Sequence, residues 1–284
     1  MSVDLHSHST ASDGSYTPSQ LARAFKAAGV KIAALTDHDT VGGLNEFLST
    51  CGEIGVAGIG GIEFSTVFRG IEVHLLGYGL PLDDPICSGF LERHREYLIG
   101  RCRDTIAKLA KFELYITIEQ VLKNSGGNPP MPPHILKALA DNGCFSDLGS
   151  AIAIFHEYLA FGAKAWVDHG TRFESPLEML IETGAKAIVA HPFRFPNLSW
   201  LEEMLDLGAH GFELYYPDHN GEFFEKLKSI ADKRGCLVTG GCDYHGAFAH
   251  RTMREVNIPL KVGIDFLKAL KMDVPDELLS EVES

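Results

Sequence analysis

The chain has 284 residues, 45% of them hydrophobic, and carries a formal net charge of −13 at pH 7. This length and apolar content suffice for a full hydrophobic core, either in one barrel with an insertion or in two modest domains. The acidic balance disfavours a basic surface that would bind nucleic acid without sequence preference, so we expect no long nucleic acid as a partner.

The apolar runs are strand-sized and are interrupted by charged residues or glycine, so we expect no membrane span and no membrane partner. The N-terminal segment enters a strand without the basic and apolar regions of a signal peptide. Six cysteines are scattered without paired C-x-x-C spacing, which indicates neither a zinc knuckle nor a disulfide framework. We therefore expect a cytoplasmic protein with free thiols.

The first predicted strand covers residues 2–8, where alternation of the side chains places Asp4, His6 and His8 on one face. Because they share a face, His6 and His8 can bind one metal ion together. Asp13 follows in the loop at residues 11–15. Ionisable residues therefore gather where this strand ends.

A helix is predicted next, with Thr17 as its cap and Gly29 at its end. The apolar strand at residues 32–35 follows and runs into His38 and Asp39. A strand again ends in residues that can hold a metal ion or orient a ligand.

Two further strands are predicted close together in the chain. Residues 56–64, rich in glycine and isoleucine, end in Glu63, and residues 71–76 form a neighbouring strand that supplies His74. Both residue types bind divalent transition metals, so these strands extend the set of possible ligands.

The second half of the chain repeats the pattern. Residues 187–190 are apolar and run directly into His191, and residues 236–241 lead to Asp243 and His245, again two positions apart. Helices are predicted between these strands, and the alternation of strand and helix is typical of a βα barrel.

Between about residues 91 and 166 this alternation stops and helical patterns take over. The predicted helices there are 93–112, 118–123, 134–142 and 150–161. A stiff, proline-rich link at residues 128–133 places His134 at a helix start. The predicted domains are a barrel at 1–92 and 167–284 and a small helical insert at 93–166. An insert beside a barrel mouth commonly forms a wall of the substrate site.

Nine potential metal ligands thus follow apolar, strand-like runs in six segments: His6, His8, Asp13, His38, Glu63, His74, His191, Asp243 and His245. Burying so many acids and imidazoles together would be very costly without cations to neutralise them. Surface positions are the alternative, but the apolar runs that lead into these residues argue against them. The pattern predicts one multi-metal site at the rim of a barrel.

Five motifs carry a family resemblance: Asp4-Leu5-His6-Ser7-His8, Thr36-Asp37-His38-Asp39, Gly61-Ile62-Glu63, Ala190-His191-Pro192 and Gly241-Cys242-Asp243-Tyr244-His245-Gly246. With these motifs the chain resembles the PHP (polymerase and histidinol phosphatase) family of metal-dependent phosphoesterases, in particular its stand-alone bacterial branch. The resemblance covers most of the chain and includes the helical insert. It implies a distorted (β/α)7 TIM-like barrel with two or three divalent metal ions at the C-terminal ends of its strands.

The resemblance also implies how the ligands are divided among the metal ions. The first ion would be held by His6, His8, Glu63 and Asp243. The second would share Glu63 and add His74 and His191. The third would be held by Asp13, His38 and His245. Mixed imidazole and carboxylate ligation favours Mn²⁺, Fe²⁺ or Zn²⁺ over Mg²⁺ or Ca²⁺.

Two positions depart from the pattern of that branch. An arginine often precedes the histidine at the head of an insert helix, whereas this chain has Pro132 there and keeps His134. A lysine or arginine expected near the end of the insert corresponds to Lys164, displaced by one position. These departures leave the substrate less defined than the metal site.

Cations near the metal ions would stabilise negative charge on the phosphoryl oxygens. Arg194, on the loop after His191, is the first candidate, with a solvated loop arginine as the alternative. His134 and Lys164 are expected to reach the substrate from the insert. His219, after another strand, is expected to contact or protonate the leaving group.

Two acids are expected to orient ligands by hydrogen bonds. Asp4 should lie deeper in the barrel than His6 and orient it, and Asp39 should do the same in its own segment. The remaining histidines have no ligand partner at a fixed spacing and are expected to be surface or hydrogen-bonded residues: His94, His156, His169, His210 and His250.

These residues predict a metal-dependent phosphoesterase that hydrolyses a small phosphate monoester, with a nucleotide or a short oligonucleotide end favoured. The reaction would be attack on phosphorus by a metal-activated hydroxide. One alternative is an amidohydrolase-type C–N hydrolase, which also uses metals at barrel strand ends. Another is a non-catalytic, metal-dependent protein that binds nucleotide or phosphate, an alternative motivated by the lost arginine.

Overall fold

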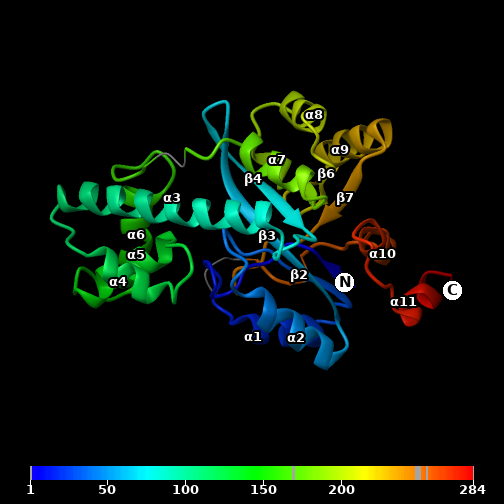
Figure 1. Ribbon diagram of the computed structural model, residues 1–284, viewed down its shortest axis with the longest axis horizontal. Helices are drawn as coiled ribbons and strands as arrows, with labels where there is room; N and C mark the ends of the chain where they lie inside the picture. The colour runs from blue at the N-terminus through cyan, green and yellow to red at the C-terminus, as the bar shows by residue number, and fades with distance from the viewer. Residues whose placement is uncertain (1, 168–169, 247–250, 254, 284) are drawn as a thin grey trace.

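The computed structural model describes residues 2–167, 170–246, 251–253 and 255–283. Within these residues, seven strands form one sheet in chain order. They are β1 Val3–Asp4, β2 Ile32–Leu35, β3 Ala57–Phe68, β4 Ile71–Tyr78, β5 Lys186–Val189, β6 Gly211–Tyr215 and β7 Leu237–Gly240. The sheet curls, and helices lie around its outside (Figure 1). The predicted α/β barrel-like fold is confirmed.

The two edges of the sheet meet just beyond β1 and β7. The backbone N–H of Leu5 donates to the carbonyl of Gly240 at 2.9 Å, and that of His8 donates to Tyr244 at 2.9 Å. Ser7 and Tyr244 form an isolated parallel bridge between the same segments. Closure of the sheet therefore brings the residues after the first strand beside those after the last.

β4 is the departure from a parallel barrel. It pairs antiparallel with both β3 and β5, whereas the other neighbouring strands are parallel. Only Arg69 and Gly70 connect β3 to β4, with φ of 52° and 79°. Two such residues form a tight hairpin, whereas a parallel connection needs a long crossover. Glu63 and His74 consequently lie within long strands, and the prediction that Glu63 ends its strand was wrong.

Helices cover the outside of the sheet and bury apolar faces against it. They are α1 Pro18–Ala27, α2 Leu44–Ile54, α7 Glu174–Glu182, α8 Ser199–Asp206, α9 Gly221–Arg234, α10 Leu260–Ala269 and α11 Asp276–Glu283. The predicted start of α1 is confirmed. The Thr17 hydroxyl accepts from the backbone N–H of Gln20, and the Gln20 side-chain oxygen accepts from the backbone N–H of Thr17. Leu21 and Phe25 of α1 then pack with α2 and β2 in a buried cluster.

The insert is helical and has its own small core. Its elements are α3 Pro85–Ala110, α4 Ile118–Asn124, α5 Pro132–Asp141, α6 Leu148–Ile154 and η1, a π-helical turn at Phe155–Leu159. Buried residues such as Cys102, Leu109, Val121 and Leu139 join these elements. The helix α3 begins at Pro85 rather than at the predicted residue 93, because Asp84 caps it and Pro85 occupies its first turn.

The helix α3 therefore starts beside the barrel and runs out to the insert as one continuous rod (Figure 1). At about 1.5 Å per residue, its 26 residues span roughly 39 Å. Across the described part of the chain, no helix is both long and apolar enough to cross a membrane.

Candidate metal centre

Glu63 lies at the centre of the predicted ligands and is completely buried. Its Oε1 contacts Nδ1 of His74 at 2.8 Å and Nε2 of His191 at 3.0 Å. Its Oε2 lies 3.0 Å from Nε2 of His6 and 3.1 Å from Nε2 of His8. One carboxylate thus stands between two groups of imidazoles, with one oxygen facing each group.

One group has the dimensions of a metal site. It contains Nε2 of His6, Nε2 of His8, Oε2 of Glu63 and Oδ1 of Asp243. The five distances that join each of the two imidazole nitrogens to the other and to the two carboxylate oxygens are 3.0–3.4 Å. Four ligand atoms bound tetrahedrally at about 2.0 Å would lie about 3.3 Å apart. The donor atoms of this group therefore fit a metal ion.

A second group gathers around Asp13. One ligand atom each from His8, Asp13, His38 and His245 lies within 4.8 Å of the others. Asp13 lies 3.3 Å from His245 and 3.9 Å from His38, and the rings of His8 and His245 stack at 4.0 Å. The group contains the three residues expected for the third metal ion and adds His8.

A third group joins the two strands of the hairpin. Ligand atoms of His38, Glu63 and His74 lie within 4.8 Å of one another, and His191 reaches Glu63 from the end of β5. The structure thus brings all nine predicted ligands together. His8 and His38 each lie in two groups, so the geometry alone does not divide the ligands as the family resemblance implies.

The charges in the cluster favour bound cations. Burial lowers the pKa of His8, but its contacts with Asp243 and Glu63 outweigh this effect and raise the pKa to about 10. Burial likewise opposes a charge on His74, and Glu63 raises that pKa to about 10. The buried carboxylates therefore stabilise the protonated, positively charged form of these two imidazoles. Divalent ions bound in the cluster would neutralise the same carboxylates.

Two rings stay neutral in this environment. Burial lowers the pKa of His38 to about 4, and burial together with the charge of Arg194 lowers that of His191 to about 3. Nδ1 of His191 is buried without a hydrogen-bond partner among the described residues. Neutral imidazoles are the form that binds metals, so the donor set suits divalent ions.

Residues that sequence reasoning missed orient the ligands. Glu213 of β6 is fully buried, contacts Nδ1 of His6 at 3.0 Å and accepts from the backbone N–H of His191 at 2.9 Å. The hydroxyl of Tyr216 donates to Oδ2 of Asp243 at 2.7 Å. A glutamate within the apolar run Gly211–Tyr215 was the available signal for the first of these.

The acids predicted to orient ligands have different partners from those expected. Asp4 accepts from the backbone N–H groups of His6 at 3.3 Å and Cys242 at 3.1 Å, so it holds the backbone while Glu213 holds the His6 ring. Asp39 accepts from the N–H of Ser65 at 2.9 Å. These acids connect neighbouring strand ends.

Of the predicted substrate residues, Arg194 is exposed and His134 is buried. Arg194 lies on η2, a short 3-10 turn at Pro192–Arg194, where its side chain is exposed. His134 is buried at the start of α5, Nδ1 accepts from the N–H of Met131, and the charge of Asp13 acts on its pKa. Both therefore lie near proposed metal ligands.

His219 is buried among aromatic rings that include Tyr216, beside Asp243. Its Nδ1 donates to the carbonyl of Leu214 at 3.1 Å, and its Nε2 has no hydrogen-bond partner among the described residues. Burial lowers the pKa of His219 to about 4. The ring is therefore neutral at pH 7, with an accepting nitrogen.

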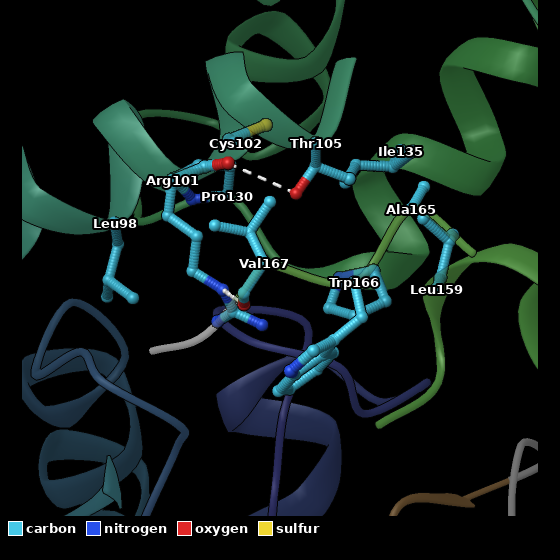
Figure 2. A pocket seen from close by; sticks show the side chains of 11 residues that line it. Leu98, Arg101, Cys102, Thr105, Pro130, Ile135, Leu159, Ala165, Trp166 and Val167 are labelled. Carbon is cyan, nitrogen blue, oxygen red and sulfur yellow. Dashed lines mark hydrogen bonds between the residues drawn. The ribbon is translucent and has the colours of Figure 1, made fainter. Parts of the chain in front are cut away.

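Lys164 is not brought to the cluster. Its ammonium pairs with Glu157 at 2.5 Å and lies over the rings of Phe112 and Tyr158 on the insert. Arg101 of α3 lies over the ring of Trp166 at 4.6 Å and donates to the carbonyl of Val167 at 2.9 Å (Figure 2).

Arg101 and Trp166 line a small cavity, partly open to solvent, between α3 and the proline-rich link. Leu98 and Ile135 make part of its wall apolar (Figure 2).

Of the other histidines, His94 is buried and hydrogen-bonded, and His210 accepts from the N–H of Ala187. His169 and His250 lie outside the described residues.

Comparison with known proteins identifies the family. A model of the PHP domain matches residues 4–124. A 5'-3' exoribonuclease from Haemophilus influenzae is 30% identical over 249 residues, which cover 85% of this chain and 89% of that protein. The chain belongs to the PHP domain family. A 3',5'-nucleoside bisphosphate phosphatase from Chromobacterium violaceum is 29% identical over 251 residues, covering 86% of this chain and 87% of that protein.

Solved structures share the fold. A crystal structure from Bifidobacterium adolescentis superposes with a TM-score of 0.83 and covers 95% of this chain and 96% of its own, at 24% identity. A protein described as an amidohydrolase from Chromobacterium violaceum, with bound sulfate, gives a TM-score of 0.74 at 26% identity and covers 87% of this chain and 88% of its own.

Proposed function

We propose that this protein is a metal-dependent phosphoesterase that hydrolyses a small phosphate monoester. The observation that carries the proposal is the buried Glu63 carboxylate, whose two oxygens each face a separate pair of imidazoles at 2.8–3.1 Å. A carboxylate in this position can bridge two metal ions, and paired ions serve hydrolysis of phosphate esters. The phosphatase and exoribonuclease names of the relatives support the same chemistry.

The nine clustered residues would hold two or three divalent ions, with Mn²⁺, Fe²⁺ or Zn²⁺ suited to mixed nitrogen and oxygen ligands. His6, His8 and Asp243 would share one ion with Glu63, and the other groups would hold the rest. When bound, the ions would supply Lewis acidity toward water and the phosphoryl oxygens.

The chain's own residues would position the ligands and the substrate. Glu213 fixes the ring of His6, and the Tyr216 hydroxyl fixes Asp243. Arg194 places a positive charge near His191, where it would bind an anionic phosphoryl oxygen. His219 stays neutral, so its Nε2 would accept a hydrogen bond from a hydroxyl of the leaving group rather than protonate it.

The favoured substrate is a nucleotide or the end of a short oligonucleotide. The named relatives include a nucleoside bisphosphate phosphatase and an exoribonuclease. The substrates that these names imply each carry a phosphate attached to a nucleoside. A net charge of −13 would repel a long nucleic acid unless bound metal ions offset it locally. Small substrates therefore fit the chain best.

An amidohydrolase is the second candidate, because one solved structure of the same fold is described by that name. A non-catalytic binding protein remains the third, since Pro132 and Lys164 supply no cation to the cluster from the insert. All three functions predict bound metal, so substrate assays must separate them.

The test combines metal analysis with a substrate panel. We expect two to three equivalents of transition metal in the purified protein, and turnover of nucleoside monophosphates or bisphosphates with Mn²⁺. Turnover of amides alone would favour the amidohydrolase. Protection of the protein against unfolding by nucleotides, without turnover of any panel member, would show a binding protein. Less than one equivalent of metal, even after reconstitution, would refute the metal centre.

A further inference from the structure

His94 is a buried histidine on α3 that none of the proposed metal groups contains. It lies in the part of α3 beside the barrel, before the helix reaches the other elements of the insert. Its ring stacks on Phe90 at 5.9 Å and meets the edge of Phe64 from β3 at 5.6 Å. These contacts fix the ring between the helix and the sheet.

The fixed ring bonds to Asp39. Nε2 of His94 lies 2.7 Å from Oδ1 of Asp39. An ionised carboxylate only accepts hydrogen bonds, so Nε2 is the donor. This contact joins α3 to the residue that directly follows the proposed ligand His38.

Asp39 in turn holds the backbone at Glu63 and at Ser65, two residues further along β3. Its N–H donates to the carbonyl of Glu63 at 2.9 Å, and its Oδ1 accepts from the N–H of Ser65 at 2.9 Å. Asp39 also has a left-handed backbone with φ of 56°, an unfavourable conformation that surrounding contacts must maintain. The position of its side chain therefore influences both His38 and Glu63.

We propose that His94 is a positioning residue of the metal centre, which anchors α3 to Asp39 and thereby fixes His38 and Glu63. The inference rests on the metal centre of the proposed function but not on any particular substrate. It assigns α3 a second role besides carrying the insert, because the same helix holds the ligand segment in place.

Two substitutions separate the hydrogen bond from the packing of the ring. His94→Met fills a similar space but cannot donate to Asp39. His94→Gln can place an amide N–H where Nε2 lies. Leu98→Ala is the matched control, because Leu98 is buried one turn further along α3 and has no contact with Asp39 among those described.

The measurement is calorimetric titration of the metal-free, full-length protein with Mn²⁺. We expect His94→Met to weaken binding by about 10- to 100-fold, the usual effect of losing a residue that orients a ligand segment. His94→Gln should stay within about threefold of the parent, and Leu98→Ala should bind Mn²⁺ as the parent does even if its melting temperature falls.

Three results would overturn the inference: Mn²⁺ binding by His94→Met that equals the parent's, an equal loss in Leu98→Ala, or a parent that binds no Mn²⁺. If His94→Met does not fold, Asp39→Gly provides the second variant, because glycine tolerates the left-handed backbone and has no side-chain oxygen to accept from His94. Normal Mn²⁺ affinity in Asp39→Gly would then be the contrary result. Metal binding is measured without turnover, so failure of the phosphoesterase proposal alone leaves this test valid.

Discussion

Replacing Glu63 with glutamine keeps the side-chain volume but removes the charge and one of the two accepting oxygens. In the structure, the carboxylate makes four contacts of 2.8–3.1 Å with imidazole nitrogens. Glutamine can retain about half of them through its remaining oxygen. Hydrogen bonds to charged groups contribute about 1.5–3 kcal/mol each, so losing two costs roughly 3–6 kcal/mol.

This energy corresponds to a loss of about 10²- to 10⁴-fold in the rate or in metal affinity. The assay is kcat on the best nucleotide of the panel with Mn²⁺, together with the metal content of Glu63→Gln. Glu203→Gln is the control, because Glu203 pairs with Arg69 at the surface and its loss removes the same charge. Activity of Glu63→Gln within threefold of the parent, with full metal content, would refute the bridging role.

Three further predictions test the surroundings of the site. Tyr216→Phe removes the 2.7 Å bond to Asp243, and a loss of about 1.5–3 kcal/mol should weaken Mn²⁺ binding by roughly 10- to 150-fold; unchanged binding in calorimetry would contradict this role. His219→Asn should raise KM more than it lowers kcat. Because the pKa of His219 is about 4, the parent and the variant should have the same pH dependence of activity between pH 5 and 8. Burial raises the pKa of the Cys51 thiol to about 12, so iodoacetamide at about pH 8 should label the exposed Cys144 and spare Cys51, as mass spectrometry of the native protein can check.

Local features of the site could be predicted because they depend on short-range periodicity. The two-residue spacing of His6 and His8 puts both rings on one face of a strand, and the structure brings their Nε2 atoms to 3.1 Å. The same spacing in Asp243 and His245 places both residues in the cluster. Thr17 likewise marks the start of α1, because a cap acts on the next three residues.

The antiparallel direction of β4 could have been predicted from the sequence but was not. Arg69 and Gly70 form the two-residue turn of a hairpin, and this turn reverses the chain. The predicted strands at residues 56–64 and 71–76 were placed as neighbours, but their relative direction was not stated. The hairpin carries Glu63 and His74 along neighbouring strands, so their side chains meet within the sheet.

The residues that support the ligands depended on contacts between distant segments. Glu213 meets His6 across 207 positions of the chain, and His94 meets Asp39 across 55. No short-range pattern links such partners. Lys164 illustrates the same limit, because its place at the end of the insert suggested the substrate site, whereas a nearby glutamate pairs with it at the surface.

The sequence by itself determined which residues could be ligands, since ligand chemistry and strand periodicity are properties of single residues and short segments. Only the tertiary structure decided how the ligands are grouped and what orients them, because closure of the sheet and the course of α3 set the distances between segments. Glu63 illustrates both the contribution of the sequence and that of the tertiary structure. Its chemistry made it a possible bridge, and the antiparallel hairpin placed its oxygens between two sets of histidines.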